Sequence, residues 1–275
     1  MITSTSNARV KELVQLQKKS KVRNEQGVFL VEGVKMYQEI PQEQLVKVYV
    51  SETFADKQKE EINRLKDRRK LEYLSDHVFQ YVSDTKTPQG ILCVVRQSAY
   101  CLEDILEAED AHLLVLDNLQ DPGNLGTILR TAEGAGVTGI IISKESVDIY
   151  NPKVIRSTMG SIYRVPFVYV EDLKEAIAKV KAHGIFTYAA HLDGKNSYDK
   201  EDYTKKTAFL IGNEGNGLRK EIADLADTWI RIPMQGQVES LNAAIATSVL
   251  MFETARQRSC LLYTSDAADE LDGVD

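Results

Sequence analysis

The sequence has few cysteines, and it lacks an apolar run long enough to span a bilayer. Its 275 residues include only Cys93, Cys101 and Cys260, and none of them forms a CxxC pair. The odd number and wide spacing exclude a disulfide framework and a zinc knuckle, and they fit a reducing cytosol. Residues 240–252, an uncharged stretch near the C-terminus, fall short of the ~18–20 apolar residues of a membrane span. The first ten residues lack the apolar core of a secretion signal, so we expect a cytoplasmic protein without a membrane partner.

Signatures of phosphate and metal binding are also missing. The glycine-containing segment 117–136 follows an apolar run but carries neither a G-x-G-x-x-G fingerprint nor G-K-[ST]. This disfavours a nicotinamide or nucleotide-phosphate enzyme. The histidines His77, His112 and His183 stand alone, without HExxH or similar spacing, so we expect no metal site.

Positive charge is in the minority, but it is unevenly distributed. The chain has 34 Lys and Arg against 41 Asp and Glu, a net charge of −7, and its 43% hydrophobic and 27% charged composition is typical of a globular protein. Such an average argues against a nucleic-acid partner. However, residues 1–23 hold six basic side chains against one acid, and residues 261–275 hold five acids and no base. The acidic average therefore does not exclude a basic surface for a nucleic acid.

The first part of the chain predicts a small α/β unit. Ser6 is expected to cap a helix, because Val10, Leu13, Val14 and Leu16 recur every three or four residues. The other expected elements are strands at 27–33, 45–51 and 90–97 and helices at 34–40 and 57–70.

From residue 112 onward, apolar strands alternate with helical patterns. This alternation predicts a mostly parallel sheet that is covered on both faces, with ligands at the carboxyl ends of its strands. The expected strands are 112–118, 139–143, 165–170, 185–192, 207–213 and 228–234, and the expected helices are 125–135, 152–159, 171–183, 218–226 and 241–258.

Four segments follow from these patterns. We expect a first domain at 1–97, a linker at 98–111 and a second domain at 112–258. The mixed, acidic linker shows little periodicity. Residues 259–275 are expected to be a disordered or non-native tail, because the last fifteen residues show neither a helical nor a strand period.

Two polar residues follow the first strand of the second domain. Asn124 is expected to cap the next helix, and Arg130, six residues later, is expected in its second turn. Taken alone, this pattern fits an ordinary strand-to-helix turn equally well.

Two further polar clusters follow later strands. The loop in 209–221 places Glu214 among three glycines, which favours a ligand-facing loop over a plain turn. In 230–253, Ser240 is expected to cap a long helix with Asn242 in its first turn. The apolar run that follows is expected to be a buried packing face.

Together, the three motifs point to a known family. The order N-x-G-x-x-x-R, G-x-E-G-x-G-L and I-P-M-x-G-x-x-x-S-L-N-x-A-x-A closely resembles the signature motifs of the SpoU (TrmH-type) RNA ribose 2′-O-methyltransferases of the SPOUT superfamily. This resemblance covers residues 112–258. The N-terminal segment, with its basic helix and VFLVEG strand, is similar to the ribosomal-protein-like substrate-binding domain of many members.

The resemblance implies a Rossmann-like catalytic domain that is closed by a deep trefoil knot and binds S-adenosylmethionine. It also implies a homodimer with the active site at the subunit interface. The implied cofactor-binding residues are Ala190, His191, Gly212, Ile232, Met234 and Leu241. The implied residues for substrate and catalysis are Asn124, Arg130, Glu214, Ser240 and Asn242.

In the family, the residue that matches Arg130 is the one proposed to act on the ribose hydroxyl. Because the pKa of arginine is above ~12, it is a poor base. An alternative role is to stabilise the developing alkoxide or grip the adjacent phosphate, while another group or water takes the proton.

The expected activity is methyl transfer from S-adenosylmethionine to a ribose 2′-hydroxyl in structured RNA. The separate N-terminal domain favours ribosomal RNA over transfer RNA, and the alternatives are a tRNA ribose methyltransferase and a non-catalytic RNA-binding protein. The residues expected to contact RNA are Arg9, Lys11, Lys18, Lys19, Lys21 and Arg23.

Overall fold

A computed structural model describes residues 1–67 and 70–269, and it gives side-chain surroundings for 1–63 and 70–260. The chain divides into two compact units. Unit 1 contains Met1–Ala99 and Asp148–Tyr163, and unit 2 contains Tyr100–Val147 and the remainder from Arg164 onward. Each unit is described by itself.

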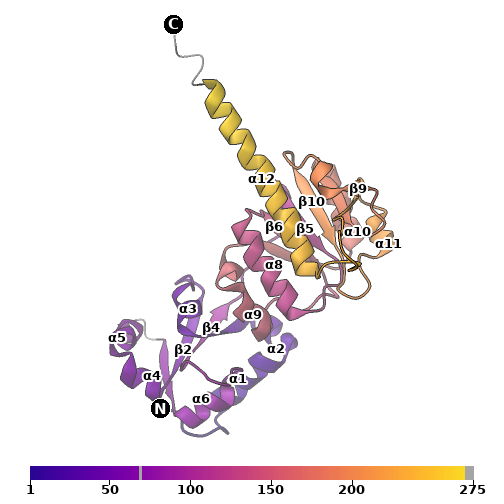
Figure 1. The fold of residues 1–275 in the computed structure, drawn as a ribbon. Helices are drawn as coiled ribbons and strands as arrows, with labels where there is room; N and C mark the ends of the chain where they lie inside the picture. The colour runs from indigo at the N-terminus through magenta and orange to yellow at the C-terminus, as the bar shows by residue number, and fades with distance from the viewer. Residues whose placement is uncertain (68–69, 270–275) are drawn as a thin grey trace. The chain divides into compact units, whose positions relative to one another are not determined.

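Unit 1 is a four-stranded sheet with helices packed against it (Figure 1). The strand order is β1-β4-β2-β3, in which β2 and β3 are parallel and the other two pairings are antiparallel. Its strands are β1 (Val28–Glu32), β2 (Leu45–Ser51), β3 (Leu71–Leu74) and β4 (Ile91–Arg96). Its helices are α1 (Ala8–Lys18), α2 (Ser20–Gln26), α3 (Val34–Gln38), α4 (Glu52–Lys57), α5 (Lys59–Asp67), α6 (Asp76–Val82) and α9 (Pro152–Thr158), with a 3-10 turn η1 at Ser161–Tyr163.

The predicted apolar stripe of α1 forms part of the core of unit 1. Val10, Leu13 and Leu16 are buried and pack in one cluster with α6 and the sheet. The predicted cap is wrong by one residue. Asn7, not Ser6, caps α1, because its side chain accepts a hydrogen bond from the Arg9 amide at 2.9 Å.

A segment from the middle of the sequence returns to unit 1. The Arg23 side chain pairs with Asp148, and the ring of Phe29 lies 4.6 Å from that of Tyr150. Residues 148–163 therefore belong with unit 1, although the sequence analysis assigns them to the second domain. Apolar residues at helical spacing show that a short helix has a buried side, but they do not show which core it joins.

Unit 2 contains a seven-stranded sheet in the order β7-β6-β5-β10-β8-β11-β9, and every pairing is parallel, as predicted. The two-residue β9 was not predicted. The strands are β5 (His112–Leu116), β6 (Gly139–Ser143), β7 (Phe167–Val170), β8 (Phe186–Ala190), β9 (Asn196–Ser197), β10 (Thr207–Ile211) and β11 (Thr228–Arg231). The helices are α7 (Leu102–Leu106), α8 (Pro122–Gly134), α10 (Leu173–Ala182), α11 (Lys220–Ala223) and α12 (Ala243–Asp269), with a 3-10 turn η2 at Tyr198–Lys200.

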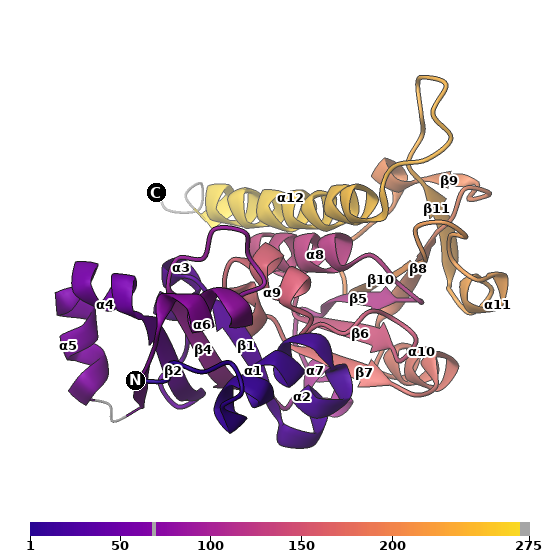
Figure 2. The ribbon, with the colours of Figure 1, turned by 90° about the horizontal axis from the view of Figure 1, so that it is seen from below.

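Helices cover both faces of this sheet (Figure 2). Helices α8 and α12 pack together on one face, and α7, α10 and α11 contribute to the core on the other. Helix α7 falls inside the predicted linker at 98–111. Leu102, Ile105 and Leu106 are buried in the core of unit 2, so these residues are part of a domain.

The C-terminal end differs from the prediction. The predicted disordered or non-native tail begins at residue 259, whereas α12 continues to Asp269, so 259–269 are helical rather than disordered. Residues 270–275 of that predicted tail lie outside the described residues. In the described part of the chain, no helix combines the length and apolarity needed to cross a membrane.

Candidate active site

A cavity of about 410 Å³ lies at the carboxyl ends of β8, β10 and β11. The loops that follow these three strands, together with the first turns of α12, form its walls. Parallel sheets place ligand sites at this edge. The six residues expected to hold a cofactor all line this one cavity: Ala190, His191, Gly212, Ile232, Met234 and Leu241.

The loop after β10 has room only for glycine at its base. A Cβ atom at Gly212 would lie 2.0 Å from the backbone nitrogen of Leu218, which is far closer than atoms can approach. Asn213 and Gly217 exchange backbone hydrogen bonds of 3.0 and 2.9 Å, and Gly217 has a φ of +69°, so the loop closes on itself. The glycines therefore hold a tight hairpin at the cavity wall.

The loop after β8 is fixed against β11. The His191 amide donates to the Ile230 carbonyl at 3.0 Å, and the His191 ring lies 4.5 Å from that of Trp229. A Cβ atom at Gly194 would lie 2.6 Å from the Ile230 carbonyl carbon, so the two segments touch along their backbones. His191 thus lines the cavity with its ring held by packing.

Glu214 joins the glycine loop to the segment before α8. Its Oε1 accepts from the Asp121 amide at 2.9 Å and from Asn124 Nδ2 at 3.0 Å, and its Oε2 accepts from the Gln120 amide at 3.0 Å. Partial burial alone would raise the pKa of Glu214. The hydrogen bonds from Asn124, Gln120 and Asp121 outweigh burial and lower that pKa, which keeps the group a carboxylate.

Asn124 and Asn242 continue this chain of hydrogen bonds. Because the Glu214 carboxylate only accepts, Asn124 must donate to it with Nδ2, which leaves Asn124 Oδ1 to accept from Asn242 Nδ2 at 3.0 Å. Asn242 Oδ1 then accepts from the amides of Ala244 and Ile245 at 2.9 and 3.3 Å. Side chains from all three sequence motifs thus form one connected chain that ends at the N-terminus of α12.

Two predicted helix caps are wrong. Asp121, not Asn124, caps α8, because its side chain accepts from the Asn124 amide at 2.8 Å. Asn242, not Ser240, accepts from the first amides of α12. Asn124 is therefore available for the hydrogen-bond chain, and Ser240 is available to line the cavity.

The other two residues expected at the reaction centre lie differently. Ser240 is exposed and lines the cavity. Arg130 lies in the third turn of α8, not the second, and is not among the cavity-lining residues. Its side chain is exposed, and the structure shows no partner for it among the described residues, so it is free to meet a substrate.

The six basic residues expected to contact RNA differ in their exposure and in their partners. Lys11, Lys18, Lys19 and Lys21 are exposed, and Arg9 is exposed but pairs with Glu72. Arg23 is buried, and its guanidinium donates to the Leu16 and Gln17 carbonyls at 2.7 and 3.1 Å as well as to Asp148. Arg23 is therefore a structural residue of unit 1 rather than part of a basic surface.

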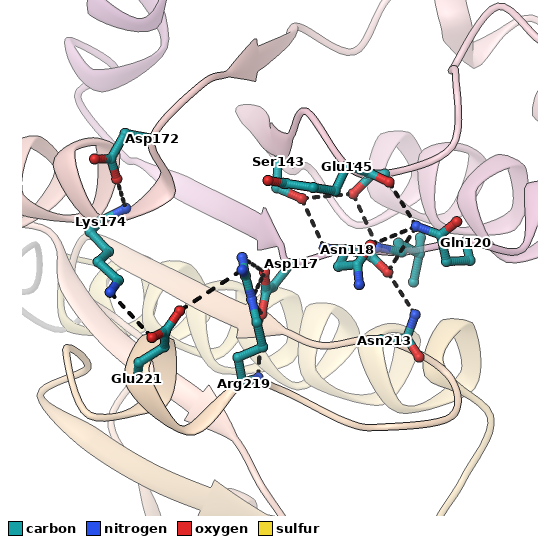
Figure 3. A network of polar contacts seen from close by, with 12 residues as sticks. Asp117, Asn118, Gln120, Ser143, Glu145, Asp172, Lys174, Asn213, Arg219 and Glu221 are labelled. Carbon is teal, nitrogen blue, oxygen red and sulfur yellow. Dashed lines mark hydrogen bonds and ion pairs between the residues drawn. The ribbon is translucent and has the colours of Figure 1, made fainter.

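Sequence reasoning missed the polar residues directly behind the site. Asp117 is buried and pairs with Arg219, and Asn118 accepts at its backbone carbonyl from Asn213 Nδ2 at 2.7 Å (Figure 3). The one signal in the sequence is the Asp-Asn pair after an apolar strand. Among the described residues, no three His, Cys, Asp or Glu side chains gather as a metal site.

Comparisons with known proteins agree with this geometry. Residues 111–252 match the model of the SpoU rRNA Methylase family, and residues 7–93 match that of the MRM3-like substrate binding domain. The 23S rRNA (guanosine(2553)-2′-O)-methyltransferase RlmP of Bacillus subtilis is 31% identical over 251 residues, which cover 91% of this chain and 97% of the relative.

Two crystal structures share the whole architecture. An AdoMet-bound rRNA methyltransferase from Sinorhizobium meliloti superposes with a TM-score of 0.80 at 31% identity, covering 93% of this chain and 97% of the other. The SpoU methyltransferase AviRb from Streptomyces viridochromogenes, in complex with AdoMet, has a TM-score of 0.81 at 28% identity, covering 92% of this chain and all of the other. The chain belongs to the SpoU family and is an RNA methyltransferase of that family.

Proposed function

We propose that this chain transfers a methyl group from S-adenosylmethionine to a ribose 2′-hydroxyl of ribosomal RNA. The observation that carries this proposal is the convergence of the three motifs. The chain Glu214–Asn124–Asn242 borders a cavity lined by all six residues expected to hold the cofactor. The relatives support the choice of RNA, since the Bacillus subtilis relative is a 23S rRNA 2′-O-methyltransferase.

The cavity fits the chemistry of this cofactor. Apolar side chains of Leu218, Ile230 and Leu250 line it and suit a purine ring. Asp193 and Glu239 add carboxylates to the lining and suit a ligand that carries a positive sulfonium. The tight glycine hairpin brings backbone rather than side chain to the wall at Gly212, where the adenosine part would bind. The trefoil knot that the resemblance implies stays a prediction.

The residues of this chain have separate roles in the proposed reaction. When bound, S-adenosylmethionine supplies a methyl group that is already activated by the sulfonium. Glu214, which lines the cavity, and Asn242 hold Asn124 in one orientation. Arg130, whose guanidinium has no partner among the described residues, stabilises the alkoxide developing on the ribose or grips the neighbouring phosphate. The 2′-hydroxyl proton then leaves to another group or to water.

We also propose that unit 1 holds the RNA through its first two helices. The exposed lysines of α1 and α2 and of the turn between them supply positive charge without a buried role. The match to a substrate-binding domain over residues 7–93 supports this division of labour. The presence of a separate unit also supports ribosomal over transfer RNA.

We further propose that the chain forms a homodimer. Ile245 and Phe252 lie seven residues apart on one side of α12, and they are 50% and 52% exposed. Large apolar side chains on one helix face favour burial against another surface. We propose that this face of α12 contributes to contact with a second copy of the chain.

The test is methylation of ribosomal RNA by the purified chain. Ribosomal RNA from cells lacking the gene is incubated with labelled S-adenosylmethionine, and 2′-O-methylnucleosides are identified by mass spectrometry after digestion. The Arg130→Ala variant is expected to lose at least ~10²-fold in kcat, as removal of a transition-state donor does. Thr127→Ala, an exposed change one turn earlier in α8, serves as the matched control and retains activity.

The pH–rate profile of Arg130→Lys distinguishes this role from the alternative in which the arginine itself takes the hydroxyl proton. A profile parallel to that of the wild type assigns Arg130 to charge stabilisation, whereas a shift toward the pKa of lysine assigns it to proton transfer. Full activity of Arg130→Ala would remove Arg130 from the mechanism. Failure of folded protein to bind S-adenosylmethionine in calorimetry would instead favour a non-catalytic RNA-binding protein.

A further inference from the structure

A charged pair lies directly behind the cavity and outside the family motifs described above. Asp117 follows β5 and its side chain is fully buried, with 0% exposure. Arg219 Nε donates to Asp117 Oδ1 and Oδ2 at 2.9 and 3.0 Å, and its Nη2 also donates to Oδ1. The Arg219 amide adds a contact of 3.3 Å to Oδ2. Burying a carboxylate is costly unless it is paired in this way, so the pair requires an explanation.

The position of Arg219 in the chain suggests one. Arg219 directly follows Leu218, and Leu218 lines the cavity and packs against the base of the glycine hairpin at Gly212. The hairpin thus leaves β10 at Ile211 and returns at Arg219. Because Asp117 belongs to the segment that directly follows the neighbouring strand β5, the pair fixes the returning end of the hairpin to a rigid part of the sheet.

The same hairpin is tied to the segment after β5 at two more places. Asn213 Nδ2 donates to the Asn118 carbonyl, and Glu214 accepts from the amides of Gln120 and Asp121 (Figure 3 shows the first of these beside the Asp117–Arg219 pair). Three places along residues 117–121 are thus tied to the hairpin. The segment that is tied in this way leads into α8, which carries Asn124 and Arg130.

We propose that Asp117 and Arg219 are positioning residues that hold the glycine hairpin in the shape needed to bind S-adenosylmethionine. The inference rests on the proposed function, because it assigns this cofactor to the cavity. The planar, two-pronged contact of arginine matters here, since a lysine ammonium cannot reproduce it. The pair touches no reacting group and acts through the hairpin.

A nearby surface pair provides a matched control. Glu221 lies 3.9 Å from Arg219 and 3.3 Å from Lys174, and all three side chains are substantially exposed (Figure 3). Glu221→Gln therefore removes charge two residues beyond Arg219 without touching Asp117. An exposed pair of this kind contributes little to stability.

The experiment compares the wild type with Arg219→Lys, Asp117→Asn/Arg219→Gln and Glu221→Gln. The double variant avoids leaving an unpaired buried carboxylate, so it remains testable if single changes unfold the chain. Calorimetry gives the Kd for S-adenosylmethionine, kinetics give KM for RNA, and hydrogen exchange reports on amides 212–218. We expect Arg219→Lys and the double variant to weaken cofactor binding about tenfold, the lower end of the loss seen when an outer partner of a metal ligand is removed. The KM for RNA of both pair variants is expected to stay within twofold of the wild-type value. For Glu221→Gln, both the Kd for S-adenosylmethionine and the KM for RNA are expected to stay within twofold of the wild type.

Hydrogen exchange separates this proposal from the proposed function. Faster exchange in amides 212–218, with unchanged exchange in β10, is expected for both pair variants whether or not the cavity binds S-adenosylmethionine. A wild type that binds no S-adenosylmethionine would overturn the proposed function. Folded pair variants with wild-type exchange in the hairpin, or with wild-type cofactor affinity, would overturn the positioning role.

Discussion

At the scale of single residues, Asn118 stands out by its backbone. Its φ of 55° is one of only two positive values among the non-glycine residues that the structure describes, the other being at Met159. Asn tolerates this left-handed conformation better than most residues. The conformation turns the Asn118 carbonyl toward Asn213, while the Asn118 amide donates to Ser143 Oγ at 2.8 Å. The turn thus directs the segment after β5 toward the hairpin.

This backbone role predicts different effects for two substitutions at one position. Both Asn118→Gly and Asn118→Val lose the hydrogen bond from Gln120 Nε2 to Asn118 Oδ1, so this loss cancels when the two variants are compared. We expect the free energy of unfolding of Asn118→Val to be about 1–2 kcal/mol lower than that of Asn118→Gly, because a β-branched residue is strained in the left-handed conformation. Urea denaturation measures both. Equal stabilities would show that the conformation at 118 is not required.

At the scale of elements, the strands of unit 2 were predicted well for a clear reason. Strands buried on both faces, such as β6 with Ile140, Ile141 and Ile142, appear in the sequence as uninterrupted apolar runs. The ends of helices were harder to place. Asp121 and Asn124, or Ser240 and Asn242, are all competent caps, and the choice depends on a tertiary partner that local sequence does not reveal.

In the candidate site, too, some residues could be predicted from the sequence, whereas others depend on partners that are distant in the sequence. Its motif residues were predicted because a resemblance carried them, and the structure brings most of them to one edge of the sheet. The Asp117–Arg219 pair was not predicted, because the two residues are 102 positions apart in sequence. The burial of Arg23 was not predicted either, because its partner Asp148 is 125 positions away. Local composition showed Arg23 only as one more basic residue.

Glu214 links the glycine hairpin to the segment before α8, and this link predicts that its contribution to folding stability depends on pH. Its pKa is lowered from the usual 4.5 in the folded chain, so the folded state favours the carboxylate. The contribution is therefore complete above the unfolded pKa and is lost as the pH falls through the folded pKa. We expect Glu214→Gln to be less stable than the wild type near pH 7, with a difference that shrinks below about pH 4.5. Denaturant unfolding across this range measures it, and a difference independent of pH would contradict the role of the charge.

At the scale of the whole molecule, net charge proves a poor guide to the partner. The chain is acidic as a whole, with a net charge of −7, yet Lys11, Lys18, Lys19 and Lys21 are all exposed within a short segment of unit 1. Phosphates respond to the local field of such a segment, because salt screens charges beyond about 8 Å at physiological ionic strength. The structure refines this picture by removing Arg23 from the surface.

This local charge predicts how RNA binding responds to salt. The binding constant for ribosomal RNA is measured between 50 and 200 mM salt for the wild type and for Lys18→Gln/Lys19→Gln. We expect the slope of log K against log salt to become shallower by about 0.7–0.9 for each phosphate that the variant no longer neutralises, while the affinity for S-adenosylmethionine stays unchanged. Lys205→Gln/Lys206→Gln changes the net charge equally in unit 2 and serves as the control. If both double variants shifted the slope alike, total charge rather than the basic helices of unit 1 would govern the attraction to RNA.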